Sequence, residues 1–208
     1  MKIGVIGCTK GIGKEVLSQA IKQQFDVTVL VRDKTKITDK NISLIEGDFK
    51  DYDSVKKLAE GVDVIVVSVG LPPTFSKVNL FSKGTENIIK ATKELNVNPL
   101  IIAVTGIGAG DSKGHGGFFY DKIMNPLLLK TIYEDKNRQE QILTNQYNNS
   151  IIVRPGFLTH QPKTENYKVI TDLTDVKAGK ISRADVADFI LKQAKSPTFL
   201  NQTPLITY

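Results

Sequence analysis

Long hydrophobic runs are missing from this sequence of 208 residues. No segment approaches the roughly 20 consecutive apolar residues of a membrane-spanning helix, so we expect none. Tryptophan is absent and cysteine occurs once, at Cys8, which rules out an internal disulfide and suits a reducing compartment. The apolar residues before Cys8 are too few for an export signal, and we interpret them as a strand. We therefore expect a cytoplasmic protein.

The sequence also lacks blocks of like charge. Its 28 basic and 22 acidic residues give a net charge of +6, but they are mixed along the chain, and aromatic residues are not interleaved with the basic ones. A nucleic-acid partner is therefore not expected. We expect a small-molecule substrate, no metal, and a monomer or a dimer.

What the sequence does contain is an alternation of strand and helix patterns. Short, largely β-branched runs predict strands, and apolar residues at helical spacing predict the helices between them. The strands are predicted at residues 2–7, 27–31, 42–45, 62–69, 100–104 and 151–153, and the helices at residues 11–24, 53–60, 76–95 and 120–146. Asp51 or Asp53 is the expected N-cap of the second helix, and the last helix is expected to be interrupted near Pro126. This order predicts an α/β fold with a doubly wound parallel sheet.

The last quarter of the chain carries weaker patterns. A small strand is predicted at residues 167–170, a helix at residues 183–195 with Ser182 as its N-cap, and a final strand at residues 204–207. No repeat or linker interrupts the sequence. We expect one domain over residues 1–208, with a small substrate-site elaboration over about 157–208.

The turn after the first strand is rich in glycine. Glycines in a first strand-to-helix turn let bare backbone approach a pyrophosphate, which the helix N-terminus then binds. The spacing here is G-x-x-x-G-x-G, which differs from the commonest dinucleotide pattern, and a tight turn that binds nothing is the alternative. The predicted cofactor-binding residues of this turn are Gly7, Thr9, Lys10, Gly11, Ile12 and Gly13.

The end of the second strand reads VLVRD. In this position a carboxylate receives the ribose 2′-hydroxyl of NAD, whereas an arginine accommodates the 2′-phosphate of NADP. Arg32 lies at that point, and Thr9 and Lys10 could reach the same group, which favours NADP(H) over NAD(H). Asp33 is the counterargument, because a small shift of the strand end would place its carboxylate at the ribose. The alternative for Arg32 itself is a solvated loop charge.

Seven segments in sequence order resemble the atypical short-chain dehydrogenase/reductase group, namely NAD(P)H-binding Rossmann-fold proteins similar to flavin reductase/biliverdin-IXβ reductase and to NmrA-like proteins. The segments are GCTKGIG, VTVLVRD, EGDF, VIVVSVG, GTENIIKA, YEDKNRQE and IIVRPGFL. The resemblance implies that Asp48 and Phe49 contact the adenine and that Val69 and Gly70 pass beside its ribose. It also implies that the nicotinamide is bordered by Thr105, Lys136, Pro155, Gly156 and Phe157.

The catalytic residues depart from the pattern of that group. Short-chain dehydrogenases place a serine before the glycine-rich loop and Tyr-x-x-x-Lys on the next helix. Here the serine position resembles Thr105 or Gly106, and the helix offers Tyr133-x-x-Lys136, whose side chains differ by about 60° and can still share a face. Flavin-reductase-like proteins carry histidines near the site. In this chain the matching positions resemble those of Lys136 and Gly156, and His160 lies just beyond. The lack of histidine at these positions argues against a bilin substrate.

A glycine-rich loop follows the strand at residues 100–104. Residues 106–117 should border the nicotinamide and form a candidate lid, with Phe118, Phe119 and Tyr120 either as an apolar wall for a planar acceptor or as anchors of the next helix. His115 is expected to be a solvated side chain and not a general acid. Cys8 is expected to pack in the core, since no histidine and acid accompany it.

These features predict an NADPH-dependent reductase that transfers hydride to a planar, electron-poor acceptor such as a flavin or a quinone. A simple ketone would need a proton donor, for which Tyr133 with Lys136 is the best pair. A second hypothesis is a redox sensor of the NmrA-like type that binds NADP without turnover. A sugar-nucleotide epimerase is less favoured, because about fifty residues after Gly156 leave little room for a substrate domain.

Overall fold

A computed structural model describes residues 1–118 and 120–208, with only the backbone for residues 124–126. An 8-stranded sheet has the order β3-β2-β1-β4-β5-β6-β10-β8. Its strands are β1 (Lys2–Ile6), β2 (Asp26–Val31), β3 (Ser43–Glu46), β4 (Val64–Val67), β5 (Leu100–Val104), β6 (Ser150–Pro155), β8 (Lys168–Ile170) and β10 (Leu205–Thr207). All pairs are parallel except β8 with β10. The prediction of a doubly wound α/β sheet is confirmed.

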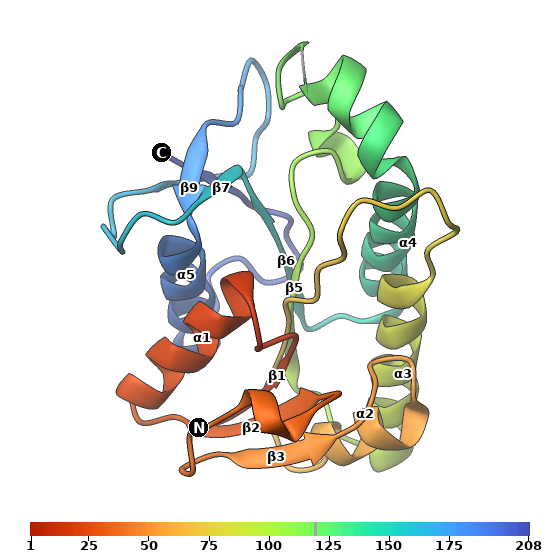
Figure 1. Cartoon of the computed structure of the whole chain (residues 1–208), viewed down its shortest axis with the longest axis vertical. Helices are drawn as coiled ribbons and strands as arrows, with labels where there is room; N and C mark the ends of the chain where they lie inside the picture. Colours follow the sequence, from red (N-terminus) through yellow and green to blue (C-terminus); the bar gives the residue numbers. More distant parts are fainter. Residues whose placement is uncertain (119) are drawn as a thin grey trace.

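Helices cover both faces of this sheet, as Figure 1 shows. One face carries α1 (Gly11–Lys22) and α5 (Arg183–Lys195), and the other carries α2 (Tyr52–Ala59), α3 (Leu80–Leu95) and α4 (Lys130–Gln146). Because side chains alternate along a strand, Ile102 of β5 packs under α1 and α5 while its neighbours Ile101 and Ala103 pack under α2 to α4. Both faces are therefore hydrophobic, which explains the continuous apolar runs of the central strands.

Several helix boundaries differ from the prediction. The helix expected at residues 76–95 begins at Leu80, and the short helix before it begins at Tyr52, capped by Asp51, whose Oδ2 accepts from the Ser54 amide at 2.9 Å. The segment expected as one interrupted helix is a π-helix, η3 (Tyr120–Leu129), followed by α4. The break therefore lies at Leu129 and not at Pro126.

The start of α3 is capped from another helix. Asn79, at the N-cap position, makes no side-chain cap, and the fully buried Asp135 of α4 takes its place. Its Oδ2 accepts from the Phe81 amide at 2.8 Å, and its carboxylate also accepts from the Ser82 hydroxyl and the Arg138 guanidinium. This contact fixes α4 against α3 and so positions the next residue, Lys136.

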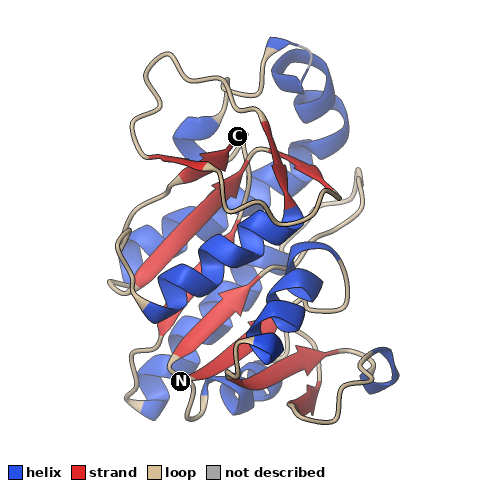
Figure 2. Ribbon diagram, turned by 90° about the vertical axis from the view of Figure 1, so that its left-hand side faces the viewer, coloured by secondary structure: helices blue, strands red, loops and turns tan. Residues whose placement is uncertain are grey.

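The last quarter adds a short parallel pair that the sequence analysis did not predict. It consists of β7 (Phe157–Thr159) and β9 (Lys180–Ser182), seen near the C-terminus in Figures 1 and 2. The Ser182 hydroxyl caps α5 by accepting from the Asp185 amide at 2.9 Å, as predicted. Among the described residues, no helix combines the length and apolar character needed to cross a membrane.

Candidate active site

A cleft of about 680 Å³ opens at the carboxyl ends of β1, β2, β4, β5 and β6. Most of the predicted site residues line it: Gly7, Thr9, Lys10, Gly11, Ile12, Arg32, Asp48, Phe49, Val69, Gly70, Thr105, Lys136 and Pro155. A hollow of about 740 Å³ beside the amino ends of β5, β6 and β10 is lined mainly by amide and hydroxyl side chains and includes none of the predicted residues. The chemistry of the lining, and not the size of the hollow, identifies the first as the candidate site.

The glycine turn has the geometry of a phosphate cradle. Gly7 has a backbone φ of +89°, which residues with a side chain rarely adopt. A Cβ on Gly13 would lie 2.1 Å from the Gly7 carbonyl oxygen. Gly13 therefore allows α1 to approach the strand ends closely, and it does not itself line the cleft. Lys10, the N-cap of α1, makes no side-chain cap, and the first turn holds no acidic residue. The first amides of α1 are thus available to an anion, so this turn fits a dinucleotide diphosphate.

Two cations line the cleft after β2, namely Arg32 and Lys36. Asp33 lies between them in sequence but caps the single turn η1 (Lys34–Lys36), accepting from the Thr35 amide at 3.0 Å and the Thr35 hydroxyl at 2.6 Å. These bonds lower the pKa of Asp33 and engage its carboxylate outside the cleft. The end of β2 therefore presents positive charge to a ligand.

Lys136 lies at the other end of the cleft. Its Nζ donates to the Val104 carbonyl at 2.9 Å and lies 4.1 Å from the centroid of the Phe81 ring. Burial lowers the pKa of Lys136 to about 8, while the carboxylates of Glu140 and Asp135 act in the opposite direction. An ammonium group that can lose its proton near neutral pH is a candidate acid or base.

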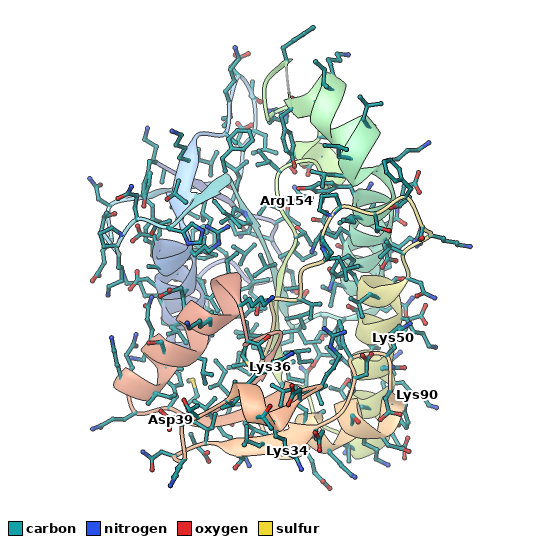
Figure 3. The ribbon with its side chains drawn as sticks, in the orientation of Figure 1. Lys34, Lys36, Asp39, Lys50, Lys90 and Arg154 are labelled. Carbon is teal, nitrogen blue, oxygen red and sulfur yellow. The ribbon has the colours of Figure 1, made fainter. Side chains whose placement is uncertain are left out.

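The hydroxyl of Thr105 is engaged by a buried ion pair. Thr105 Oγ1 donates to Glu140 Oε1 at 2.6 Å, and the same carboxylate accepts from Arg154 Nε at 3.1 Å and Nη2 at 2.6 Å. Arg154, labelled in Figure 3 beside the loop after β5, also pairs with Asp111. Because Thr105 has one hydroxyl proton, it presents only lone pairs to a ligand in the cleft.

The Tyr133 hydroxyl is also engaged. It lies 2.7 Å from the Tyr120 hydroxyl, which donates to the Ile107 carbonyl at 3.0 Å, so Tyr133 must donate to Tyr120. Burial raises the pKa of Tyr133 well above its usual range. Tyr133 is not among the residues lining the cleft. The expected pairing of Tyr133 with Lys136 toward a substrate is therefore absent in this structure.

The glycine loop is more firmly held than the sequence suggests. Ser112 is fully buried, with its hydroxyl 3.2 Å from the Gly108 amide, and the Gly110 amide donates to Asn137 Oδ1 at 2.8 Å. His115 Nδ1 lies 2.8 Å from the Val176 carbonyl, so the expectation of a solvated side chain is wrong. The loop is thus held as far as His115, whose carbonyl also accepts from the Ala178 amide at 2.8 Å. None of residues 106–117 lines the cleft, so this structure does not place the expected lid there.

The aromatic residues after this loop do not form the expected wall. Phe118 is 79% exposed, which excludes both a cleft wall and a core anchor, whereas Tyr120 packs edge-to-face on Phe157 with ring centroids 5.2 Å apart. Tyr120 is therefore an anchor. Phe119 lies outside the described residues.

Other predictions near the site also change. Gly156 and Phe157 do not line the cleft, because this part of the chain turns into β7, where the Phe157 amide donates to the Gly179 carbonyl at 2.9 Å. His160 is exposed, and Cys8 is buried with its pKa raised to about 11, as expected of a packing residue. Residues that sequence analysis missed at the cleft include Lys36, Ser68, Leu71, Pro72, Leu80, Leu158 and Arg183.

The strand order, the glycine turn and the uncapped α1 define a dinucleotide-binding protein of the Rossmann type. The chain belongs to the NAD(P)H-binding family, whose model matches residues 7–197. The predicted resemblance to NAD(P)H-binding proteins is thereby confirmed.

Individual relatives agree with this assignment. The protein YwnB of Bacillus subtilis is 25% identical over 97% of this chain and 96% of its own length. Among solved structures, ChuY of Escherichia coli O157:H7, described as an anaerobilin reductase, is 22% identical, with a TM-score of 0.83 over 100% of this chain and 97% of its own. A short-chain dehydrogenase/reductase of Veillonella parvula in complex with NADP is 16% identical, with a TM-score of 0.81 over 100% of this chain and 94% of its own. At these identities the two structures support the fold.

Proposed function

We propose that this protein is an NADPH-dependent reductase of the atypical short-chain dehydrogenase/reductase group, acting on a planar conjugated acceptor such as a flavin or a quinone. The observation that carries the proposal is one cleft that joins a phosphate-binding turn to Lys136. The hydroxyls of Thr105 and Tyr133, which would serve carbonyl chemistry, donate to other side chains. The description of a structural neighbour as an anaerobilin reductase supports an acceptor of this kind.

The roles of the residues follow from their positions. The amides of the glycine turn and of α1 would bind the diphosphate, and Thr105, Lys136 and Pro155 would border the nicotinamide. NADPH, when bound, would supply a hydride, and the acceptor gains that hydride and one proton. Lys136 would donate the proton or hold the acceptor oxygen. A flavin can take its proton from solvent, whereas the alkoxide formed from a ketone would lack a hydroxyl donor.

Selectivity for NADPH follows from the charges after β2. Arg32 and Lys36 would pair with the 2′-phosphate, and the carboxylate of Asp33, which would favour NADH, is engaged in capping η1.

The alternative is a redox sensor that binds NADPH without turnover. The engaged hydroxyls of Thr105 and Tyr133 favour it as the second candidate. The test is to titrate the purified protein with NADPH and then follow its oxidation with flavins, quinones, a bilin and aldehydes. Turnover of flavins or quinones is expected. Binding without turnover would indicate the sensor, and absence of binding would contradict both functions.

A further inference from the structure

Arg183 lines the cleft from the C-terminal part of the chain. It is the first residue of α5 and directly follows β9, which pairs with β7 in the register Thr159 to Ser182. Its Nη1 donates to the Thr159 carbonyl at 2.8 Å, which fixes the guanidinium beside the residues that follow β6. Pro155, the last residue of β6, and Leu158 of β7 line the same cleft.

The guanidinium of Arg183 has donors to spare. A guanidinium carries five N–H groups, and within the described residues Arg183 makes one side-chain hydrogen bond. The nearby carboxylates of α5 are bound elsewhere: Asp185 accepts from Ser182 and Tyr208, and Asp188 pairs with Lys163 and Lys192. Arg183 is half-buried and, in the part of the chain that the structure describes, forms no ion pair.

The charges of the cleft come from separate parts of the chain. The cations that line it are Lys10, Arg32, Lys36, Lys136 and Arg183, and the one carboxylate among the described lining residues is that of Asp48. Lys10, Arg32 and Lys36 belong to the glycine turn and the segment after β2, where the nucleotide phosphates are expected. Arg183 belongs with Leu158, which is 38% exposed and offers an apolar surface beside the charge. This combination suits a flat molecule that carries an acidic substituent.

We propose that Arg183 binds an anionic group of the acceptor, a carboxylate, phosphate or sulfonate, so that the preferred acceptors are planar conjugated molecules with an acidic substituent. The inference rests on the proposed reductase function and narrows its substrate class. Charge-assisted bonds from a guanidinium to such a group are strong and directional.

Two matched pairs of acceptors test this assignment. FMN and riboflavin differ by one phosphate, and 1,4-naphthoquinone-2-sulfonate and 1,4-naphthoquinone differ by one sulfonate. KM and kcat are measured with all four acceptors, at saturating NADPH, for the natural protein, Arg183→Gln and Arg183→Lys. Gln keeps an N–H that can donate to Thr159, and Lys keeps the positive charge. The control is Lys180→Gln, which removes an exposed cation of β9 that does not line the cleft.

The natural protein is expected to prefer the anionic member of at least one pair. Arg183→Gln should raise KM for that member about tenfold to a hundredfold, the effect of losing a hydrogen bond to a charged group, and change KM for its neutral partner less than about twofold. Arg183→Lys should keep part of the preference, and Lys180→Gln should keep all of it.

Three results would overturn the assignment. Equal increases in KM for anionic and neutral acceptors in Arg183→Gln would show that Arg183 only holds α5 against β7. An increase of tenfold or more in the Kd of NADPH would show that it binds the nucleotide. No preference for anionic acceptors in the natural protein would exclude the acidic substituent while leaving the reductase function in place. Absence of turnover with all four acceptors would instead remove the proposed function itself.

Discussion

Among single residues, Lys136 has the clearest chemical consequence. It lines the cleft, its Nζ is fixed by the Val104 carbonyl, and the neighbouring hydroxyls of Thr105 and Tyr133 donate elsewhere. The charged groups around it are the carboxylates of Asp135 and Glu140, while α3 contributes the uncharged ring of Phe81. Lys136 is therefore the side chain that we expect to hold or deliver a proton.

This role predicts a pH dependence. With a quinone acceptor, kcat/KM should fall as the pH rises through about 8, because burial lowers the pKa of Lys136 to that value and only the ammonium form donates. Lys136→Met should lower the rate about a hundredfold or more and remove this inflection. With a flavin, whose proton comes from solvent, the inflection should be weak. An unchanged profile in Lys136→Met would assign the titration to another group.

Arg32 carries the prediction for cofactor choice. Arg32→Asp should raise the Kd of NADPH about tenfold or more and leave that of NADH nearly unchanged, because only NADPH would place a phosphate against the new carboxylate. The matched control is Lys34→Asp, an equal change of charge on the same segment at a residue that pairs with Glu46 and does not line the cleft. An equal increase in the Kd of both nucleotides in Arg32→Asp would show that Arg32 does not distinguish them.

The sequence predicted the position of the glycine turn correctly, but it did not predict which hydroxyls would be available as proton donors. The spacing of Gly7, Gly11 and Gly13 between a strand and a helix is a local pattern, and the structure places this turn at the cleft. Helical spacing indicated that Tyr133 could share a face with Lys136, but it does not determine where a hydroxyl donates. The partner of Tyr133 is Tyr120, at the start of a π-helix that no local pattern predicted.

At the scale of elements, the contact of α4 with the start of α3 organises the part of the cleft that contains Lys136. Asp135 supplies the cap that Asn79 does not, and it does so from 54 residues beyond Phe81 in sequence. The same contact orients Lys136 over the Phe81 ring. Stability and site geometry therefore depend on one buried carboxylate.

Replacing that carboxylate tests its importance. Asp135→Asn should lower the free energy of unfolding by about 2 kcal/mol, because the α3 amides and the Ser82 hydroxyl lose a charged acceptor. The exposed neighbour gives the control, since Glu134→Gln should change stability by less than about 0.5 kcal/mol. Urea unfolding measures both. A loss below about 1 kcal/mol in Asp135→Asn would contradict the capping role.

Elements with strong local patterns were predicted, and those that depend on distant contacts were not. The buried β-branched runs of β2, β4 and β5 identify strands on their own. In contrast, β7 and β9 have three residues each, and neither has a hydrophobic pattern long enough to identify a strand. The start of α3 at Leu80 likewise depends on Asp135, which sequence patterns cannot place nearby.

At the scale of the whole molecule, the order of the strands brings the two ends of the cleft together. The carboxyl ends of β1, β2 and β4 form the side where we expect the nucleotide, and those of β5 and β6 present Thr105 and Pro155 beside Lys136 of α4. The segment after β6 then adds Leu158 and Arg183. A ligand that spans the cleft would contact both halves of the sheet and should stabilise the whole fold.

NADPH should accordingly raise the midpoint of thermal unfolding. A concentration one hundred times its Kd is expected to add about 2.7 kcal/mol of stability, because the nucleotide binds only the folded state. NADH at the same concentration should give a smaller shift, since it lacks the phosphate that Arg32 and Lys36 would bind. Equal shifts would contradict the selectivity of the β2 end of the cleft.

The most direct measurement is a calorimetric titration of the purified protein with NADPH and, separately, with NADH. The account predicts one NADPH bound per chain, with a Kd at least about tenfold below that of NADH, in keeping with the loss of a charge-assisted contact. If neither nucleotide bound, the diphosphate could not be occupying the amides of α1, and the central claim would be wrong.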